Sequence, residues 1–280
     1  MRIFYIFILC VGLACADDEW LRSKYSRDSI ATRELHSALY EADDPFASKY
    51  NRASLGIGFQ GGFNGGNHSP DVPLNLVVIT ARFDYWNKWL YWGVDAYMGG
   101  KGIVDIFLIA FLDTVHKGSG TSFVDEMSVR VKLGMPLFFD TQYELEYNPL
   151  FLYLVLATGG YHYDKSAPFQ AYTNLGLGVM KTFDIGDLWQ LECALEYGYM
   201  PLNEYATSQG KIKAGYNSHE IRAALGFVNR EKGWRKSTGY YVRLSGIYRL
   251  LDSIPALPNA LPAYPRSTQA IGMLEVGFAL

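Results

Sequence analysis

The fold of this 280-residue chain is constrained most by one stretch, residues 171–199, which reads AYTNLGLGVMKTFDIGDLWQLECALEYGY. Apolar and polar residues alternate in both halves, which are joined by Asp184-Ile185-Gly186-Asp187. Side chains of a β-strand point alternately to opposite faces, so each half predicts a strand with one apolar face. The stretch therefore predicts a β-hairpin with a tight turn. On its second strand the apolar face carries Leu191, Cys193, Leu195 and Tyr197, and the other face carries Gln190, Glu192, Ala194, Glu196 and Gly198.

Aromatic residues lie at both ends of this predicted hairpin. A strand that crosses an outer membrane needs about ten residues, with one face in lipid and aromatic side chains at both membrane surfaces. We therefore predict an all-β protein, a single-chain antiparallel transmembrane β-barrel in the outer membrane of the cell. The aromatic girdle that we expect consists of Trp86, Trp89, Phe183, Trp189, Tyr197 and Tyr199.

The composition agrees with a barrel and argues against other classes. The 21 Tyr and 28 Gly are typical of a β-rich chain with aromatic girdles and tight turns. A formal net charge of −3 argues against a nucleic-acid partner. After the N-terminus there is no apolar run of about 18 residues, the length that would predict a membrane-spanning helix. The partners that we expect are outer-membrane lipid, the outer-membrane assembly machinery and small solutes.

The N-terminus predicts a signal peptide over residues 1–16. Arg2 supplies the positive charge, residues 3–13 form an apolar core, and Ala14-Cys15-Ala16 is a small-x-small cleavage site. The alternative is lipoprotein processing at Cys15, although Gly12 stands where such sites usually have Leu. Cleavage before Asp17 would leave Cys193 as the one cysteine, on the apolar face of its strand.

The rest of the chain predicts two regions. Residues 17–54 are expected to form a periplasmic extension, either poorly ordered or with a short helix within 29–42, and residues 55–280 the barrel. Residues 100–120 are apolar on every side between flanking glycines, which favours a helical insert in an outer loop over another strand. We expect about ten strands, or twelve if this insert is a strand and residues 142–147 form a separate one.

Two parts of the chain resemble families of Gram-negative outer-membrane barrels that are of unknown function or assigned to transport. GGKGIVDIFLIAFLD resembles a Gly-rich helical insert that follows the third strand of such barrels. The series SVRVKLGMPLFF, NPLFLYLVLATGG and NLGLGVMKTFDIGDLWQLECALEYGY is similar to their order of strand, strand and strand–turn–strand. The resemblance implies the barrel fold and the outer membrane, and it implies no substrate and no catalytic residue.

Charged residues occupy the inward positions of the predicted strands. The candidate lumen residues are Arg82, Asp84, Asp95, Glu126, Arg130, Lys132, Glu192, Glu196, Glu220, Arg222, Arg243, Arg249 and Glu275, and the alternation also turns Glu144 and Glu146 inward. Charges removed from bulk water must pair with each other or face a water channel. They therefore predict either ion pairs that fill a narrow barrel or a narrow polar pore. We predict a narrow or gated channel for small polar solutes, with a closed barrel in a structural or surface-interaction role as the alternative.

An outer-membrane enzyme that hydrolyses lipid or peptide is a lesser alternative. His162 and Asp164 have the spacing that turns both side chains to one face near an outer loop, and they are the one hint of catalysis. His68-Ser69 and Ser218-His219 are adjacent pairs, so their side chains would point to opposite faces. We therefore expect no enzymatic activity, no cofactor and no metal site.

Overall fold

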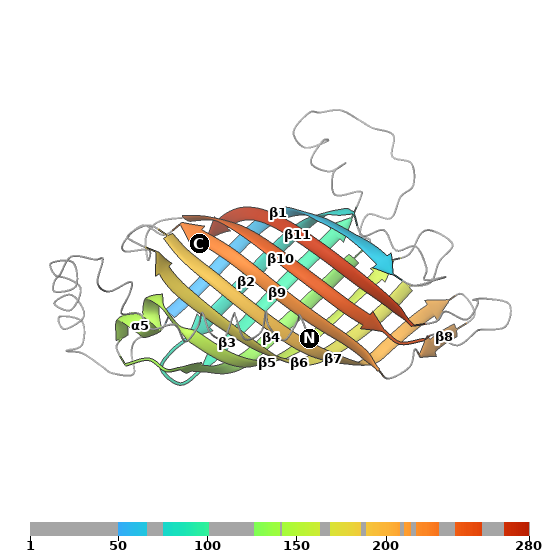
Figure 1. The fold of residues 1–280 in the computed structure, drawn as a ribbon, viewed down its shortest axis with the longest axis horizontal. Coiled ribbons are helices and arrows are strands. Elements are labelled where there is room, and N and C mark those ends of the chain that lie inside the picture. Colours follow the sequence, from blue (N-terminus) through green and yellow to red (C-terminus); the bar gives the residue numbers. More distant parts are fainter. Residues whose placement is uncertain are drawn as a thin grey trace, which may run out of the picture.

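A computed structural model shows the chain as a closed antiparallel β-barrel (Figure 1). The structure describes residues 50–65, 75–100, 126–140, 142–162, 169–185, 189–207, 210–213, 217–229, 239–253 and 266–279. Ten strands of this described part form the wall, which confirms the predicted fold class. They are β1 (Tyr50–Gly65), β2 (Leu76–Trp86), β3 (Tyr91–Gly100), β4 (Glu126–Leu137), β5 (Leu150–His162), β6 (Phe169–Ile185), β7 (Trp189–Thr207), β9 (Ser218–Asn229), β10 (Gly239–Leu251) and β11 (Ser267–Ala279).

The strands pair in an up-and-down order, and the barrel closes where β1 pairs with β11. A short strand, β8 (Gly210–Lys213), pairs with the last residues of β7 and adds no strand to the wall, because β7 pairs along most of its length with β6 and β9. The alternative of twelve strands is wrong, since residues 142–147 form a helix, α5 (Gln142–Tyr147), between β4 and β5.

The two ends of the barrel differ. At the turn end, Asn87–Leu90 link β2 to β3 with a hydrogen bond from the Asn87 N–H to the Leu90 carbonyl, and α5 links β4 to β5. The described chain also begins at this end with Tyr50 and finishes here with Ala279. The opposite end, which we call the loop end, carries β8 (Figure 1). Short connections lie on the periplasmic side of bacterial barrels, so the turn end is the periplasmic end.

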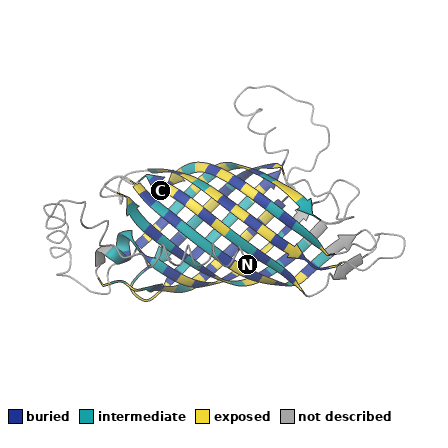
Figure 2. Ribbon diagram, in the orientation of Figure 1, coloured by how far each residue is buried: buried dark blue, intermediate teal, exposed yellow. Residues whose placement is uncertain are grey.

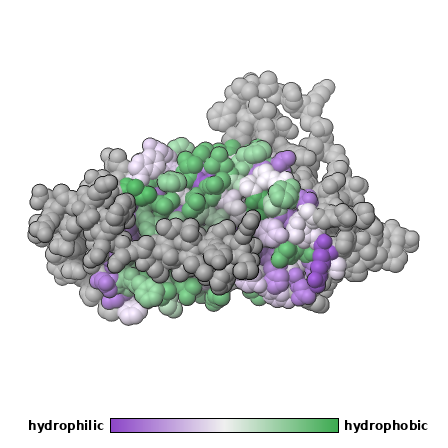
Figure 3. All heavy atoms as spheres, viewed as in Figure 1, coloured by the Kyte–Doolittle hydropathy of each residue, from purple (hydrophilic) through white to green (hydrophobic). Residues whose placement is uncertain are grey.

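Burial alternates residue by residue along the strands and gives the wall its checkered colouring in Figure 2. In β4, Val129, Val131 and Leu133 are exposed on the outside, and Ser128, Arg130 and Lys132 are buried inside. The outer wall is therefore an apolar belt around a polar interior, and Figure 3 shows the apolar atoms over the middle of the visible wall. No helix among the described residues is long and apolar enough to span a membrane.

Inward glycines let large side chains lie flat against the wall. Gly178 of β6 is buried beneath the ring of Tyr153 from β5, and a Cβ atom on it would lie 2.3 Å from the Tyr153 Cε2 atom. A side chain at position 178 would therefore force the tyrosine ring to move. The buried ring fills the lumen where a glycine leaves space.

The loop end is tied together by Asp252, which directly follows β10. Its carboxylate accepts hydrogen bonds from the Ser253 N–H at 2.9 Å, the Arg266 Nε at 2.9 Å and the Asn217 N–H at 3.3 Å. These donors, the Ser253 N–H first, lower the pKa of Asp252. The carboxylate thus joins the ends of β9, β10 and β11 outside the membrane-spanning part.

The structure also bears on the expected region boundaries. The barrel begins at Tyr50, five residues before the expected start at Leu55, so residues 50–54 belong to β1 and not to the extension. The predicted signal peptide, most of the extension and all but the first residue of the apolar insert 100–120 lie outside the described residues. Cys193 is half-buried, forms no disulfide bond within the described part of the chain, and faces outward on β7.

Candidate functional site

The side chains of all thirteen candidate lumen residues point into the barrel. Most are almost fully buried, and Asp95 has the most exposed side chain of those that form ion pairs, at 25%. They come from strands on all sides of the barrel, because each strand sends every second side chain inward. The candidate site is therefore the lumen itself, filled by side chains.

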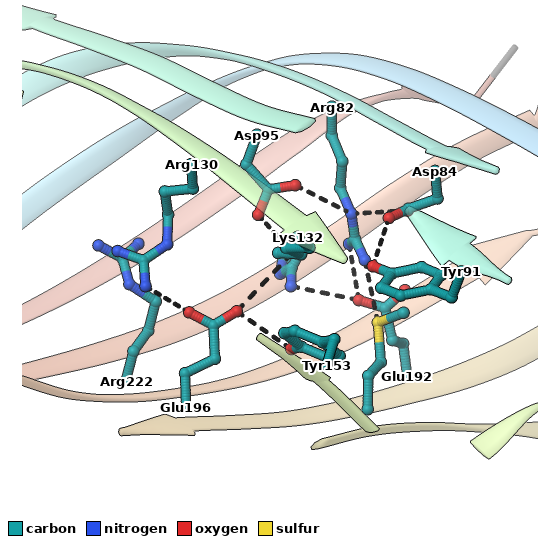
Figure 4. A network of polar contacts seen from close by, with 12 residues as sticks. Arg82, Asp84, Tyr91, Asp95, Arg130, Lys132, Tyr153, Glu192, Glu196 and Arg222 are labelled. Carbon is teal, nitrogen blue, oxygen red and sulfur yellow. Dashed lines mark hydrogen bonds and ion pairs between the residues drawn. The ribbon is translucent and has the colours of Figure 1, made fainter. Parts of the chain in front are cut away.

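On the turn side of the lumen, Glu192 of β7 is held by three arginines. Its carboxylate lies 2.6 Å from Arg52 Nη2, 2.7 Å from Arg82 Nη1 and 3.2 Å from Arg243 Nη2. Asp84 also contacts two of these arginines, because its carboxylate lies 2.9 Å from Arg52 Nη2 and 2.9 Å from Arg82 Nε. Figure 4 shows Glu192 of β7 next to Arg82 and Asp84, which both come from β2.

On the loop side, Glu220 of β9 has the corresponding role. Its carboxylate lies 2.9 Å from Arg130 Nη1 and 2.8 Å from Arg249 Nε, and it accepts a further hydrogen bond from Asn174 at 3.1 Å. Arg130 also contacts Glu196 at 2.5 Å, and Arg249 lies 3.5 Å from Glu126. Each buried carboxylate here therefore has at least one basic partner.

Asp95 and Lys132 join the two halves into one network. Lys132 Nζ lies 2.5 Å from Asp95 and 3.8 Å from Glu196, and Asp95 lies 3.5 Å from Arg82 (Figure 4). The charges of this network and its neighbours balance. The basic side chains are Arg52, Arg82, Arg130, Lys132, Arg222, Arg243 and Arg249, and the acidic ones are Asp84, Asp95, Glu126, Glu192, Glu196, Glu220 and Glu275.

One of these charges, Arg52, and the neutral polar residues around the network are not among the predicted lumen residues. Arg52 was assigned to the extension, yet its inward position follows from continuing the alternation of β1 back to Tyr50. The Tyr91 hydroxyl donates to Asp84 at 2.8 Å, the Tyr153 hydroxyl donates to Glu196 at 3.1 Å, and the Gln60 amide donates to Glu126 at 2.9 Å. The Tyr97 hydroxyl also donates to Glu126. The two-residue alternation along each strand places these side chains inside the barrel, and it is visible in the sequence.

The helix α5 closes the turn end of the lumen. Its Leu145 is buried in a cluster with Tyr50, Trp86, Tyr91 and Phe151, where the Tyr91 and Phe151 rings stack at 4.3 Å. Two carbonyl groups of α5 are held by the wall: the Trp86 indole N–H donates to the Leu145 carbonyl at 2.8 Å, and the Gln190 amide donates to the Tyr147 carbonyl at 2.9 Å. A layer of aromatic side chains thus covers the ion network on this side.

At this cap the structure differs from two predictions. Trp86 was expected in the outer girdle, but it is 2% exposed and points inward, because it shares the parity of Arg82 and Asp84 on β2. Glu144 and Glu146 were expected as inward residues of a strand, but they belong to α5, where Glu144 accepts a hydrogen bond from the Asp140 N–H at 2.7 Å.

Replacing Trp86 with phenylalanine is expected to lower the free energy of unfolding by about 1–3 kcal/mol, because the buried Leu145 carbonyl loses its indole donor. Urea unfolding in lipid vesicles, followed by the gel shift between folded and unfolded protein, measures the change. The control is Trp89→Phe, whose side chain is 67% exposed at the same end and should change stability by less than about 0.5 kcal/mol. Equal losses in both variants would show that the indole bond does not hold α5.

The other five girdle candidates lie on the outside or in the exposed turn. Trp89 is beside Lys88 in the turn, with Lys88 Nζ 5.5 Å from the ring centre, and Trp189 contacts Tyr240 edge-on at 5.8 Å. Lys181 lies 5.7 Å from the Phe183 ring. Nearer the loop end, Tyr197 and Tyr199 pack against His219.

Two small cavities lie within the lumen. One of about 20 Å³ touches Arg52, Arg82, Glu192 and Arg243, and one of about 60 Å³ lies in the middle of the network. Within the described ranges, no group of three or more His, Cys, Asp or Glu side chains is placed to hold a metal ion. His162 is at the end of β5, and Asp164 lies outside the described residues, so the structure does not describe the pair suggested by the sequence.

The sequence matches no protein-family model and no curated protein sequence. Solved structures of low identity do align with it. The outer membrane protease OmpT from Escherichia coli is 9% identical with a TM-score of 0.49, and the alignment covers 84% of this chain and 97% of that one. OprG from Pseudomonas aeruginosa is 11% identical with a TM-score of 0.32, covering 84% and 95%, and Ail from Yersinia pestis is 11% identical with a TM-score of 0.30, covering 82% and 99%.

The location of the protein follows from its own architecture. A closed barrel pairs the backbone groups of its strands without leaving an open edge, which is the condition for strands to lie in lipid. The outer belt of exposed Leu, Val, Phe and Met side chains meets the second condition, an apolar surface. The chain is therefore an outer-membrane β-barrel with an interior filled by ion pairs.

Proposed function

We propose that the protein is a closed barrel with a structural or surface-interaction role, and that its resting lumen does not conduct. The observation that carries this proposal is the balanced ion network across the lumen, from Arg52 on the turn side to Glu126 on the loop side. The cap of α5 and its aromatic cluster adds a second barrier at the turn end.

Opening this lumen has a large energetic cost. Separating one buried partner from its pair leaves an uncompensated charge, which typically costs about 3–5 kcal/mol. A passage through the centre would require several such separations, because Glu192 alone contacts three arginines. Spontaneous opening wide enough for a solute would therefore be rare.

The loop end supports a role at the cell surface. At this end β7 pairs with β6 as far as Ala206 and with β8 over residues 204–207, while its pairing with β9 ends at Met200. Past that point β7 is joined to β8 instead of β9, so this part of the wall extends at the loop end, where Figure 1 shows β8. A rigid barrel that carries such an extension is suited to present a surface to partners outside the cell.

Planar-bilayer recordings of the refolded barrel test the proposal. The wild-type protein is expected to give no discrete conductance steps. The double variant Arg82→Ala and Glu192→Ala removes only the centre of the turn-side cluster and is also expected to stay silent, because the loop-side cluster and the cap of α5 still close the lumen. Discrete steps from the folded wild type would overturn the proposal.

A narrow or gated channel is the second candidate. It is favoured by the two cavities in the lumen, which leave the side chains of the network some room to rearrange. Silence at rest followed by steps under voltage would support a gated channel. We also propose no hydrolytic activity, and loss of a lipid- or peptide-hydrolysing activity in His162→Ala would contradict this part of the proposal.

A further inference from the structure

The larger cavity has the size of a site for a small ion. Its volume of about 60 Å³ has room for about four water molecules. Pockets that bind organic ligands are typically about 300–1,000 Å³. An organic solute therefore does not fit, whereas a monatomic ion with one or two water molecules does.

The charge around this cavity is positive. Four arginines line it: Arg82, Arg130, Arg222 and Arg243. Three carboxylates also line it: Asp95, Glu196 and Glu275. The formal charge of the lining is therefore +1, although the lumen as a whole is balanced. Coulombic attraction in a site largely removed from water is strong, so this excess favours an anion.

Arg222 is the arginine with the weakest compensation. Its one ion pair among the described residues is a 3.8 Å contact from Nε to Glu220. Glu220 is already in contact with Arg130 and Arg249 at 2.9 Å or less. The Nε and Nη2 atoms of Arg222 are buried and have no hydrogen-bond acceptor within the described part of the chain, and the same is true of Arg130 Nε. Buried N–H donors without an acceptor are costly, and an anion supplies acceptors for several of them.

We propose that this cavity binds one small monovalent anion of the halide class, held by Arg222 with the neighbouring arginines of the cavity. Figure 4 shows the guanidinium groups of Arg222 and Arg130 at the same end of the network, next to Glu196. A bound anion satisfies the free donors of Arg222 and neutralises the excess charge of the lining. It acts as part of the interior and not as a solute in transit.

Equilibrium dialysis with radioactive chloride tests the site. The protein is refolded in detergent in the presence of the isotope, with gluconate as the supporting anion, so that a closed lumen does not prevent loading. The wild type is expected to bind one chloride per barrel saturably, with competition by bromide. Arg222→Gln is expected to bind at least about tenfold more weakly, and the control Arg266→Gln, which is outside the lumen, is expected to bind like the wild type.

A second variant is expected to change the affinity for chloride in the opposite direction. Glu275→Gln raises the formal charge of the lining to +2 and is expected to bind chloride more tightly than the wild type. The test still works if Arg222→Gln fails to fold, which the loss of heat-modifiable migration on a gel would show. Absence of saturable chloride binding to the folded wild type would overturn the proposal and mean that the cavity holds only water. Unchanged chloride binding in folded Arg222→Gln would also overturn it, and so would weaker chloride binding in Glu275→Gln.

Discussion

Replacing Glu192 with glutamine is expected to lower the free energy of unfolding by about 3–5 kcal/mol, among the largest effects of a single substitution in this barrel. Glu192 is 2% exposed and contacts three arginines within 3.2 Å. Glutamine retains the size of the side chain and removes its charge. The arginines would then repel each other in a site where water cannot screen them.

Reversible urea unfolding in lipid vesicles measures this loss. The control is Asp140→Asn, an exposed carboxylate between β4 and α5, which should change stability by less than about 0.5 kcal/mol. A double-mutant cycle with Arg243→Gln separates pairing from other effects, because Glu192 is the one ion-pair partner found for Arg243 in the described structure. The double variant is expected to lose less stability than the sum of the single variants, with a coupling of about 0.5–3 kcal/mol.

The same experiment distinguishes a filled lumen from a hydrated one. In a water-filled pore, the arginines around Glu192 would be solvated, and the cost of Glu192→Gln would fall to that of an exposed ion pair, about 0–1 kcal/mol. A loss below about 1 kcal/mol would therefore contradict the closed barrel and favour the channel. Wild-type conductance steps would point to the same conclusion independently.

The wall of the barrel could be predicted from the sequence because its signal is local. Two-residue alternation is visible in any run of about ten residues, and it sets which side chains turn inward. Arg130 and Lys132 could be assigned to the lumen from their positions between Val129, Val131 and Leu133. The same rule would have placed Arg52 and Trp86 inside, had the alternation been followed to the ends of β1 and β2.

The contacts inside the lumen could not be predicted in this way. The Arg52–Glu192 pair joins residues 140 positions apart, and the Arg130–Glu220 pair joins residues 90 apart. Parity shows that these side chains are inside but not which of them meet, since this depends on the closure and tilt of the barrel. α5 was missed for another reason: the sequence QYELEY alternates like a strand, and the helix depends on tertiary contacts of Leu145 and Tyr147 with the wall.

Introducing arginine at Leu244 is expected to lower the free energy of unfolding by about 2–4 kcal/mol, the range for a charge on the lipid face near the middle of the membrane. Leu244 is 56% exposed on the outside of β10, halfway between Tyr240 and Tyr248 on the same face. Its partners in register, Leu225 of β9 and Leu274 of β11, are also exposed apolar residues. An arginine there has no polar partner on the neighbouring strands.

The matched control is Leu250→Arg, on the same face of the same strand but at the loop end. The cost of arginine falls to about 0–1 kcal/mol near the membrane surface, because the guanidinium reaches water. Urea unfolding of both variants in the same vesicles gives the difference directly. A large loss at Leu244 with a small loss at Leu250 means that the apolar belt lies in lipid with its centre near Leu244. A loss below about 1 kcal/mol at both positions would mean that the membrane does not cover this part of the wall, and the assignment of the belt would then be wrong.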